Sequence, residues 1–338
     1  MTYKQAGVDV KRADKFVDIV RILAEPTEKY WRGEIVRDIG GFASVLKACG
    51  VVLGISTDGV GTKVRMASAM NQLITIGEDL VAMNANDLWV TMEPETACMH
   101  DYYAVGKLSI TDGDKVIQGI AQGCKLAGTA LVGGETAEMP IMYEPNEFEL
   151  AGTIVGVARS PNAIMYPRRD IRRGMGIFGF PSRGVHSNGF SLIHKVFGID
   201  YKDPNDAHKK LNTFYDELDT TLGDELLKPT LIYPDKISRL RRTYTIAGFA
   251  HVTGGGLMRN IPRILPPNLS GLIYTSRWPQ QPIFGLIERM GNVAKQEMLK
   301  TFNCGIGLVA ISADDLTSEG AYYIGDVVPG EATLRVRD

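Results

Sequence analysis

A glycine-rich polar stretch in the first quarter of the chain combines the residue types needed to bind a phosphate and a metal. An apolar run over residues 51–55 gives way to a stretch that contains Asp58, Gly59, Gly61, Thr62 and Lys63. Glycines let backbone N–H groups approach an anion because no side chain is in the way. The carboxylate of Asp58 suits a hard cation such as Mg²⁺, and the ammonium group of Lys63 suits a phosphate. An ordinary Asp-Gly hairpin is the alternative.

Two more carboxylates stand where the fold can bring them to the same place. Asp87 lies three residues after Asn84 in an otherwise apolar helical pattern over residues 77–92, so the two side chains project from nearly the same side. Glu135 comes shortly after an expected strand at 129–132. If Asp58, Asp87 and Glu135 converge, they form an oxygen-rich Mg²⁺ site of the kind that accompanies nucleotide triphosphates. The alternative for the helical pair is a buried Asn and Asp satisfied by backbone groups.

Two further glycine clusters are candidates for binding anionic groups. Gly133 and Gly134 are expected to form a turn at the end of the 129–132 strand. Thr253, Gly254 and Gly255 follow an expected strand at 244–250 and open a helix, and helix N-termini attract anions. A tight strand-to-helix turn explains this second cluster nearly as well.

One histidine stands in a polar glycine loop of the second half. His186 lies between an expected strand at 175–180 and an expected helix at 190–196. Because imidazole titrates near neutral pH, His186 is a candidate proton carrier if a cleft closes over it. A solvent-facing histidine is the default interpretation.

The elements that must position these side chains alternate between helix and strand, which is typical of an α/β protein, where ligands gather at the carboxyl ends of strands. A chain of 338 residues exceeds the usual size of one hydrophobic core, so two domains are expected. Residues 160–174 hold two prolines, four arginines and little apolar sequence. We therefore expect domains at 1–165 and 166–338.

Composition excludes several classes of protein. With 44% hydrophobic residues, 22% charged residues and a formal charge of -2, the chain has no polybasic region, so nucleic acid is not an expected partner. Its four cysteines form no C-x-x-C pair, which disfavours a zinc cluster and a disulfide framework and fits a reducing cytoplasm. The N-terminal residues are charged, and no stretch approaches about 18 uninterrupted apolar residues, so neither secretion nor membrane insertion is expected.

Five motifs, taken in order, resemble the phosphoribosylformylglycinamidine cyclo-ligase family, also called aminoimidazole ribonucleotide synthetases. They lie at residues 56–63, 81–87, 133–140, 186–189 and 253–256 and span nearly the whole chain. The resemblance implies two α/β domains and a homodimer formed through the N-terminal sheets, with ATP near the dimer cleft. The loop containing Arg37 and Asp38 departs from the family pattern, which has more glycines there.

The implied reaction converts formylglycinamidine ribonucleotide and ATP into aminoimidazole ribonucleotide, ADP and phosphate, by way of a phosphorylated amide. By resemblance, Asp58, Asp87 and Glu135 would hold Mg²⁺ on the phosphates, and Lys63 would offset phosphate charge. His186 would carry a proton or orient the substrate amide. Ser187 and Asn188 would supply neighbouring hydrogen bonds, and the Thr253 cluster would bind a phosphate. A sister ATP-using enzyme of the same superfamily, such as a thiamine monophosphate kinase, and a catalytically silent nucleotide-binding paralogue are the alternatives.

Overall fold

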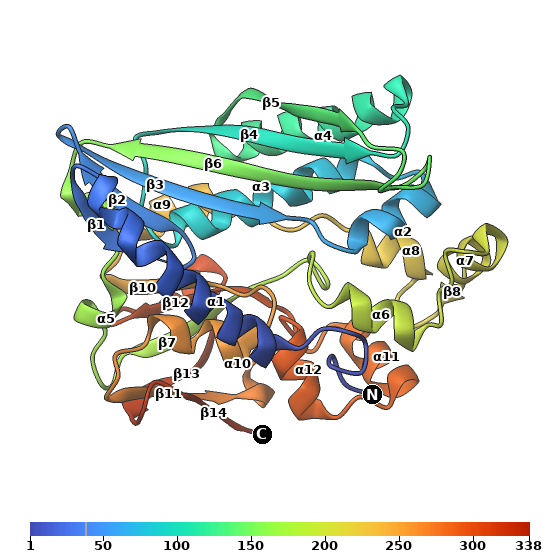
Figure 1. Cartoon of the computed structure of the whole chain (residues 1–338). Helices are drawn as coiled ribbons and strands as arrows, with labels where there is room; N and C mark the ends of the chain where they lie inside the picture. The colour runs from blue at the N-terminus through green and yellow to red at the C-terminus, as the bar shows by residue number, and fades with distance from the viewer. Residues whose placement is uncertain (38) are drawn as a thin grey trace.

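The computed structural model describes residues 1–37 and 39–338, and the described chain contains two large mixed sheets with helices packed around them (Figure 1). The first sheet has the strand order β1-β2-β3-β6-β4-β5. Its neighbours are antiparallel except for the parallel pair β4 and β5. The bounds are β1 Glu34–Arg37, β2 Ser44–Ala48, β3 Val51–Gly59, β4 Thr96–Val105, β5 Ala130–Glu138 and β6 Phe148–Ala158.

Two long helices cover one face of this sheet. They are α3 (Ile74–Trp89) and α4 (Ile110–Ala127). Glycines let them pack closely, because a Cβ added at Gly119 would lie 1.9 Å from the backbone oxygen of Ile74. A Cβ added at Gly54 would lie 2.6 Å from Leu88, so the even-numbered residues of β3 face α3. The opposite face of the sheet carries exposed side chains, including Val132 at 58% exposure.

The second sheet has the order β10-β12-β7-β13-β11-β14 and lies below the first in Figure 1. Every residue of its strand β12 is buried, which explains the continuous apolar run in that part of the sequence. The bounds are β7 Gly176–Pro181, β10 Ile246–His251, β11 Leu269–Tyr274, β12 Ile306–Ser312, β13 Tyr322–Pro329 and β14 Leu334–Arg337. A small hairpin joins β8 (Phe214–Tyr215) to β9 (Thr220–Thr221).

The remaining helices are mostly short and lie between or beside the sheets. They are α1 Val10–Ala24, α2 Lys63–Met70, α5 Pro167–Asp170, α6 Phe190–Val196, α7 Pro204–Leu211, α8 Leu222–Leu226, α9 Pro234–Thr243, α10 Gly256–Asn260, α11 Pro282–Gly291 and α12 Lys295–Thr301. Within the described ranges, none of the helices is both long and apolar enough to cross a membrane.

The first residues of the chain pack against its second half. The amino group of Met1 donates to the backbone oxygen of Asn292 (3.0 Å), and the N–H of Tyr3 donates to Glu297 (2.7 Å). The two sheets occupy residues 34–158 and 176–337, and the domain limits at 165 and 166 stay a prediction. Of the altered loop expected at 37 and 38, Asp38 and the side chain of Arg37 lie outside the described residues.

Candidate active site

A cleft of about 470 Å³ brings together three of the loops singled out in the sequence. The first begins with the last two residues of β3, which runs past the expected strand end at residue 55, and contributes residues 58–62. The second contributes residues 187–191 before and at the start of α6, and the third contributes residues 253–254 before α10. Gly61 takes a left-handed backbone conformation (φ 70°) that favours glycine. The predicted residues that line the cleft are Asp58, Gly59, Gly61, Thr62, Ser187, Asn188, Thr253 and Gly254. Gly255 caps α10 (φ 93°) just beyond them.

Asp58 and Asp87 approach each other at the end of β3. The N–H of Asp58 donates to Oδ1 of Asn84 on α3 (3.0 Å), and this bond holds the strand end against the helix. Burial, and then the negative charge of Asp87, raise the pKa of the Asp58 carboxyl to about 6. A divalent cation would relieve that repulsion. Asn84 itself is satisfied by backbone groups, as the structural alternative predicted.

A buried histidine fixes the orientation of Asp87. Nδ1 of His251, at the end of β10, lies 2.8 Å from Oδ1 of Asp87, and its Nε2 lies 3.2 Å from the amide nitrogen of Asn86. The amide oxygen of Asn86 accepts the N–H of Tyr233 (2.8 Å), so the amide nitrogen must be the group that donates to His251. The proton of the neutral imidazole is therefore on Nδ1, and His251 donates it to Asp87. This contact leaves the other oxygen of Asp87 available to a ligand.

Lys63 does not reach the cleft, which corrects its predicted role at a phosphate. It is the first residue of α2, and its fully buried Nζ lies 2.7 Å from Oδ2 of Asp79 on α3 and 2.9 Å from the backbone oxygen of Lys228. Desolvation lowers the pKa of Lys63, and the charge of Asp79 opposes that effect. Lys63 thus balances a buried carboxylate and does not face the anion-binding loop.

The Asp79 carboxylate also sets the direction of the hydrogen bond between Thr230 and Ser187 in the cleft wall. Oδ1 of Asp79 accepts both the N–H and the hydroxyl of Thr230, each at 2.7 Å. The hydroxyl oxygens of Thr230 and Ser187 are 3.0 Å apart. Because Thr230 donates its one hydroxyl proton to Asp79, Ser187 must donate to Thr230. Ser187 therefore presents lone pairs to a ligand N–H.

Asn188 offers the opposite group beside Ser187. Its amide nitrogen is buried and has no hydrogen-bond partner among the described residues. Buried polar groups are nearly always paired, so an unpaired donor in a cleft wall indicates a ligand acceptor. The loop can thus accept from one ligand atom and donate to another.

Comparison with known proteins identifies the family. The model for the AIR synthase related protein N-terminal domain matches residues 29–158, and the model for the C-terminal domain matches residues 172–336. The chain is 41% identical to the phosphoribosylformylglycinamidine cyclo-ligase of Syntrophotalea carbinolica, covering 99% of this chain and 97% of the relative. It is 42% identical to the Anaeromyxobacter dehalogenans enzyme of the same name, covering 100% and 92%.

The chain belongs to the phosphoribosylformylglycinamidine cyclo-ligase family. The predicted family and the two-domain α/β fold class are confirmed. Among solved structures, the chain resembles the HypE–HypF complex (TM-score 0.61, 16% identity, 93% of this chain and 95% of that chain). It also resembles AaThiL complexed with AMPPCP and TMP (TM-score 0.57, 13% identity, 93% and 92%). At these identities the likeness shows a shared fold.

The other residues predicted from the cyclo-ligase resemblance do not all reach the cleft. His186 takes a left-handed conformation (φ 59°) and is 1% exposed, with its Nε2 accepting the N–H of Arg183 (3.0 Å). Its ring packs on β12, where a Cβ added at Gly307 would lie 2.6 Å from it. Burial lowers the pKa of His186 well below its usual value, so the imidazole is neutral. The structure does not support its predicted contact with substrate.

Glu135 lies far from Asp58 within one chain, which corrects the predicted three-carboxylate site. Across the sheet, Asp58 is in register with Gly152, Asp101 and Gly134, so Glu135, one residue further along β5, faces the opposite side of the sheet. Three strand spacings also separate β5 from β3, about 14 Å. In the described residues, no group of three or more His, Cys, Asp or Glu side chains could hold a metal.

The turn predicted at Gly133 and Gly134 was also wrong. They lie inside strand β5, which continues to Glu138, instead of in a turn after residue 132. Position 134 requires glycine because a Cβ there would lie 2.1 Å from the carboxylate oxygen of Asp101 on the neighbouring strand. These glycines serve strand packing and do not line the cleft.

Three functional residues escaped prediction, namely Asp79, His251 and Arg263. Asp79 and Asn86 are seven residues apart and lie on one face of α3. Polar residues at this spacing in an otherwise apolar helix could have indicated a functional face. His251 stands two residues before the Thr253 cluster. Arg263 lines the cleft from the turn after α10, and its charge opposes the rise of the Asp58 pKa.

Proposed function

We propose that this chain catalyses the ATP-dependent ring closure of formylglycinamidine ribonucleotide to aminoimidazole ribonucleotide, with release of ADP and phosphate. The observation that carries the proposal is that Asp58 lines one cleft with the Ser187–Asn188 loop and is close enough to Asp87 for the two charges to repel. Relatives at about 40% identity over the full chain carry the cyclo-ligase name. Both substrates are anionic, and the cleft is lined by both acidic and basic side chains.

Asp58 and Asp87 are the residues that would hold Mg²⁺. Mg²⁺ in phosphoryl-transfer sites is bound through one or two carboxylates, with substrate phosphates and water supplying the other oxygens. The repulsion between these two carboxylates fits such an ion. When bound, Mg²⁺ neutralises charge on the phosphates of ATP. His251 keeps one oxygen of Asp87 occupied and directs the other.

The reaction needs two steps that the cleft can position. The substrate amide oxygen attacks the γ-phosphorus of ATP, the bond from that phosphorus to ADP breaks, the amide nitrogen releases its proton, and an iminophosphate forms. An internal nitrogen then attacks the activated carbon, the C–O bond breaks and phosphate leaves, and the nitrogen loses a proton. Phosphoryl transfer requires mainly positioning and charge neutralisation from the protein, which agrees with a cleft built from loops beside the Asp58–Asp87 pair.

Ser187 and Asn188 would recognise the amidine and amide ends of the substrate. Ser187 can accept from an amidine N–H because its own proton is committed to Thr230. The unpaired amide nitrogen of Asn188 can donate to a substrate oxygen. A donor and an acceptor side by side discriminate against molecules that lack the matching groups.

Two copies of the chain would pair through the uncovered face of the first sheet. That face carries Val132 (58% exposed) and Tyr102 (39% exposed), and no described helix of the chain covers it in Figure 1. Sedimentation of the purified protein should give a homodimer, and Val132→Lys should shift it toward the monomer. A reducing cytoplasm is the expected location, since all four cysteines of the described chain are free.

The decisive experiment is incubation of the protein with formylglycinamidine ribonucleotide, ATP and Mg²⁺, with detection of the aminoimidazole and of ADP. Asp58→Asn should abolish turnover, while the control Glu331→Gln, which removes the same charge from an exposed position outside the cleft lining and the proposed dimer face, should retain it. Absence of both products from wild-type protein at high substrate concentration would contradict the proposed reaction.

A further inference from the structure

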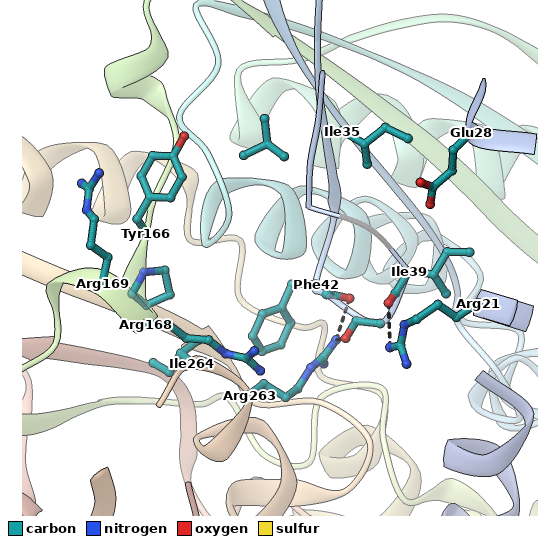
Figure 2. Close-up of a pocket in the computed structure, with 14 residues that line it drawn as sticks. Arg21, Glu28, Ile35, Ile39, Phe42, Tyr166, Arg168, Arg169, Arg263 and Ile264 are labelled. Atoms are coloured by element: carbon teal, nitrogen blue, oxygen red, sulfur yellow. Dashed lines mark hydrogen bonds between the residues drawn. The ribbon is translucent and has the colours of Figure 1, made fainter. Parts of the chain in front are cut away.

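A second cavity of about 590 Å³ lies beside the cleft and is lined by arginines. Its side chains come from separate parts of the chain, with Arg21 on α1, Phe42 before β2, Arg168 and Arg169 on α5, and Arg263 after α10 (Figure 2). We call it the arginine pocket. Its volume falls in the range typical of small-molecule sites.

The pocket has an excess of positive charge. Glu28 is the acidic residue among its described lining residues, against four arginines. Arg21 is paired with Asp18, and Arg169 is bonded through two nitrogens to Asp170. Arg168 is exposed and has no hydrogen-bond or ion-pair partner among the described residues. A guanidinium without a protein partner is free to form a bidentate contact with a phosphate.

Arg263 joins the arginine pocket to the cleft, because it lines both cavities. Its guanidinium stacks on the ring of Phe42 (3.8 Å) and donates to the backbone oxygen of Gly41 (2.7 Å). The stack holds the guanidinium in place between the two cavities. A ligand with its reactive group near Asp58 and an anionic end beyond Arg263 would therefore fit the two cavities together.

The two cavities differ in the charge they can accept. The cleft is lined by Asp58, whose carboxylate lies near that of Asp87, and such a pair suits phosphates that arrive with Mg²⁺. The arginine pocket offers guanidinium groups, which suit a phosphate without a metal. Its apolar wall, with Phe42, Ile39 and Ile264, suits the less polar part of a ligand.

We propose that the arginine pocket binds the 5′-phosphate of the ribonucleotide substrate, with Arg168 contacting the phosphate directly and Arg263 at the passage to the cleft. The proposal rests on the proposed function for the identity of the whole ligand. Arginine side chains would also bind the phosphates of ATP, so the experiment distinguishes the ribonucleotide from ATP.

Arg168→Gln tests the contact in steady-state kinetics. Loss of one charge-assisted hydrogen bond to a phosphate is expected to raise the KM for formylglycinamidine ribonucleotide about tenfold or more, with the KM for ATP unchanged. The matched control is Arg173→Gln, which removes an exposed arginine outside the pocket lining and should change neither constant. A rise in the KM for ATP alone, or no change in either KM, would overturn the proposal.

A binding measurement separates failure of this proposal from failure of the proposed reaction. Calorimetric titration of the wild-type protein with ribose 5-phosphate should show binding that Arg168→Gln weakens about tenfold and Arg173→Gln does not. This result would support the pocket even if ring closure were not observed. Equal binding of ribose 5-phosphate by wild-type and Arg168→Gln protein, or no binding by either, would refute the pocket even if ring closure is confirmed.

Discussion

Replacing Asp58 by Asn should stabilise the metal-free protein while it removes Mg²⁺-dependent activity. Burial and the charge of Asp87 raise the pKa of Asp58 from 3.8 to about 6. Each pKa unit corresponds to about 1.4 kcal/mol, so the ionised carboxylate costs the folded state at most about 3 kcal/mol at neutral pH. The amide oxygen of the substituted side chain would still accept the N–H of Gly59, which lies 2.7 Å from the carboxylate oxygen of Asp58. We expect a gain of about 1–3 kcal/mol.

The pH dependence of this gain has a defined sign. Between pH values near 3.8 and 6, the native carboxyl binds a proton that the unfolded chain has released, so the unfolding free energy of the wild type falls as pH rises. The cost of Asp58 is complete above about pH 6 and vanishes below the unfolded pKa. The advantage of the Asn variant should therefore shrink in acid.

Urea unfolding in the presence of EDTA measures the effect directly. The free energies of unfolding of wild type and Asp58→Asn would be compared at about pH 7.5 and about pH 4.5, with equal m-values as the condition for the comparison. Glu331→Gln is the control, because it makes the same chemical change at an exposed position away from the proposed dimer face and should shift stability by less than about 0.5 kcal/mol. An Asn variant that is less stable than wild type at neutral pH, or equally favoured at both pH values, would refute the reasoning.

Three further outcomes are expected. Lys63→Met should lower the unfolding free energy by about 3–5 kcal/mol because it leaves Asp79 buried without its partner. A variant that is as stable as wild type but binds ATP more weakly would show instead that Lys63 contacts the phosphate. Ser187→Ala should raise the KM for the ribonucleotide about tenfold and leave the KM for ATP unchanged, and steady-state kinetics would expose a change in the ATP constant that contradicts this role. Burial lowers the pKa of His194 to about 4, so the unfolded chain takes up its proton first on acidification, and the wild type should lose about 2 kcal/mol between about pH 7 and pH 5 that His194→Gln retains. Parallel urea titrations at the two pH values would show equal losses if His194 were not responsible.

Much of the site could be predicted from local sequence. Asp58 stands at the end of the apolar strand β3 and Gly61 follows it, and the left-handed backbone of the loop requires glycine at that position. Asp87 was found by helical spacing, because the relative directions of side chains on one helix are fixed by the helix geometry and do not depend on the rest of the fold. The Ser187 and Thr253 loops were likewise found at strand-to-helix transitions.

The direction of single side chains could not be predicted in the same way. Lys63 directly follows the anion-binding loop, yet its ammonium group turns inward because Asp79, sixteen positions later, needs a counter-charge in the core. His186 lies beside Ser187 in a polar sequence, yet its ring fills space above Gly307 of a strand more than a hundred residues away. Local composition carries no information about such distant partners.

The sequence by itself determined the family, the fold class and the loops that carry polar chemistry. The tertiary structure decided which of those groups share a cleft. The ends of β3 and β5 do point toward the same edge of the sheet, but the strand order places β6 and β4 between them, and the register turns Glu135 to the opposite face from Asp58. Strand order and register depend on pairings between distant segments, so these two properties were set by the packing of the whole chain.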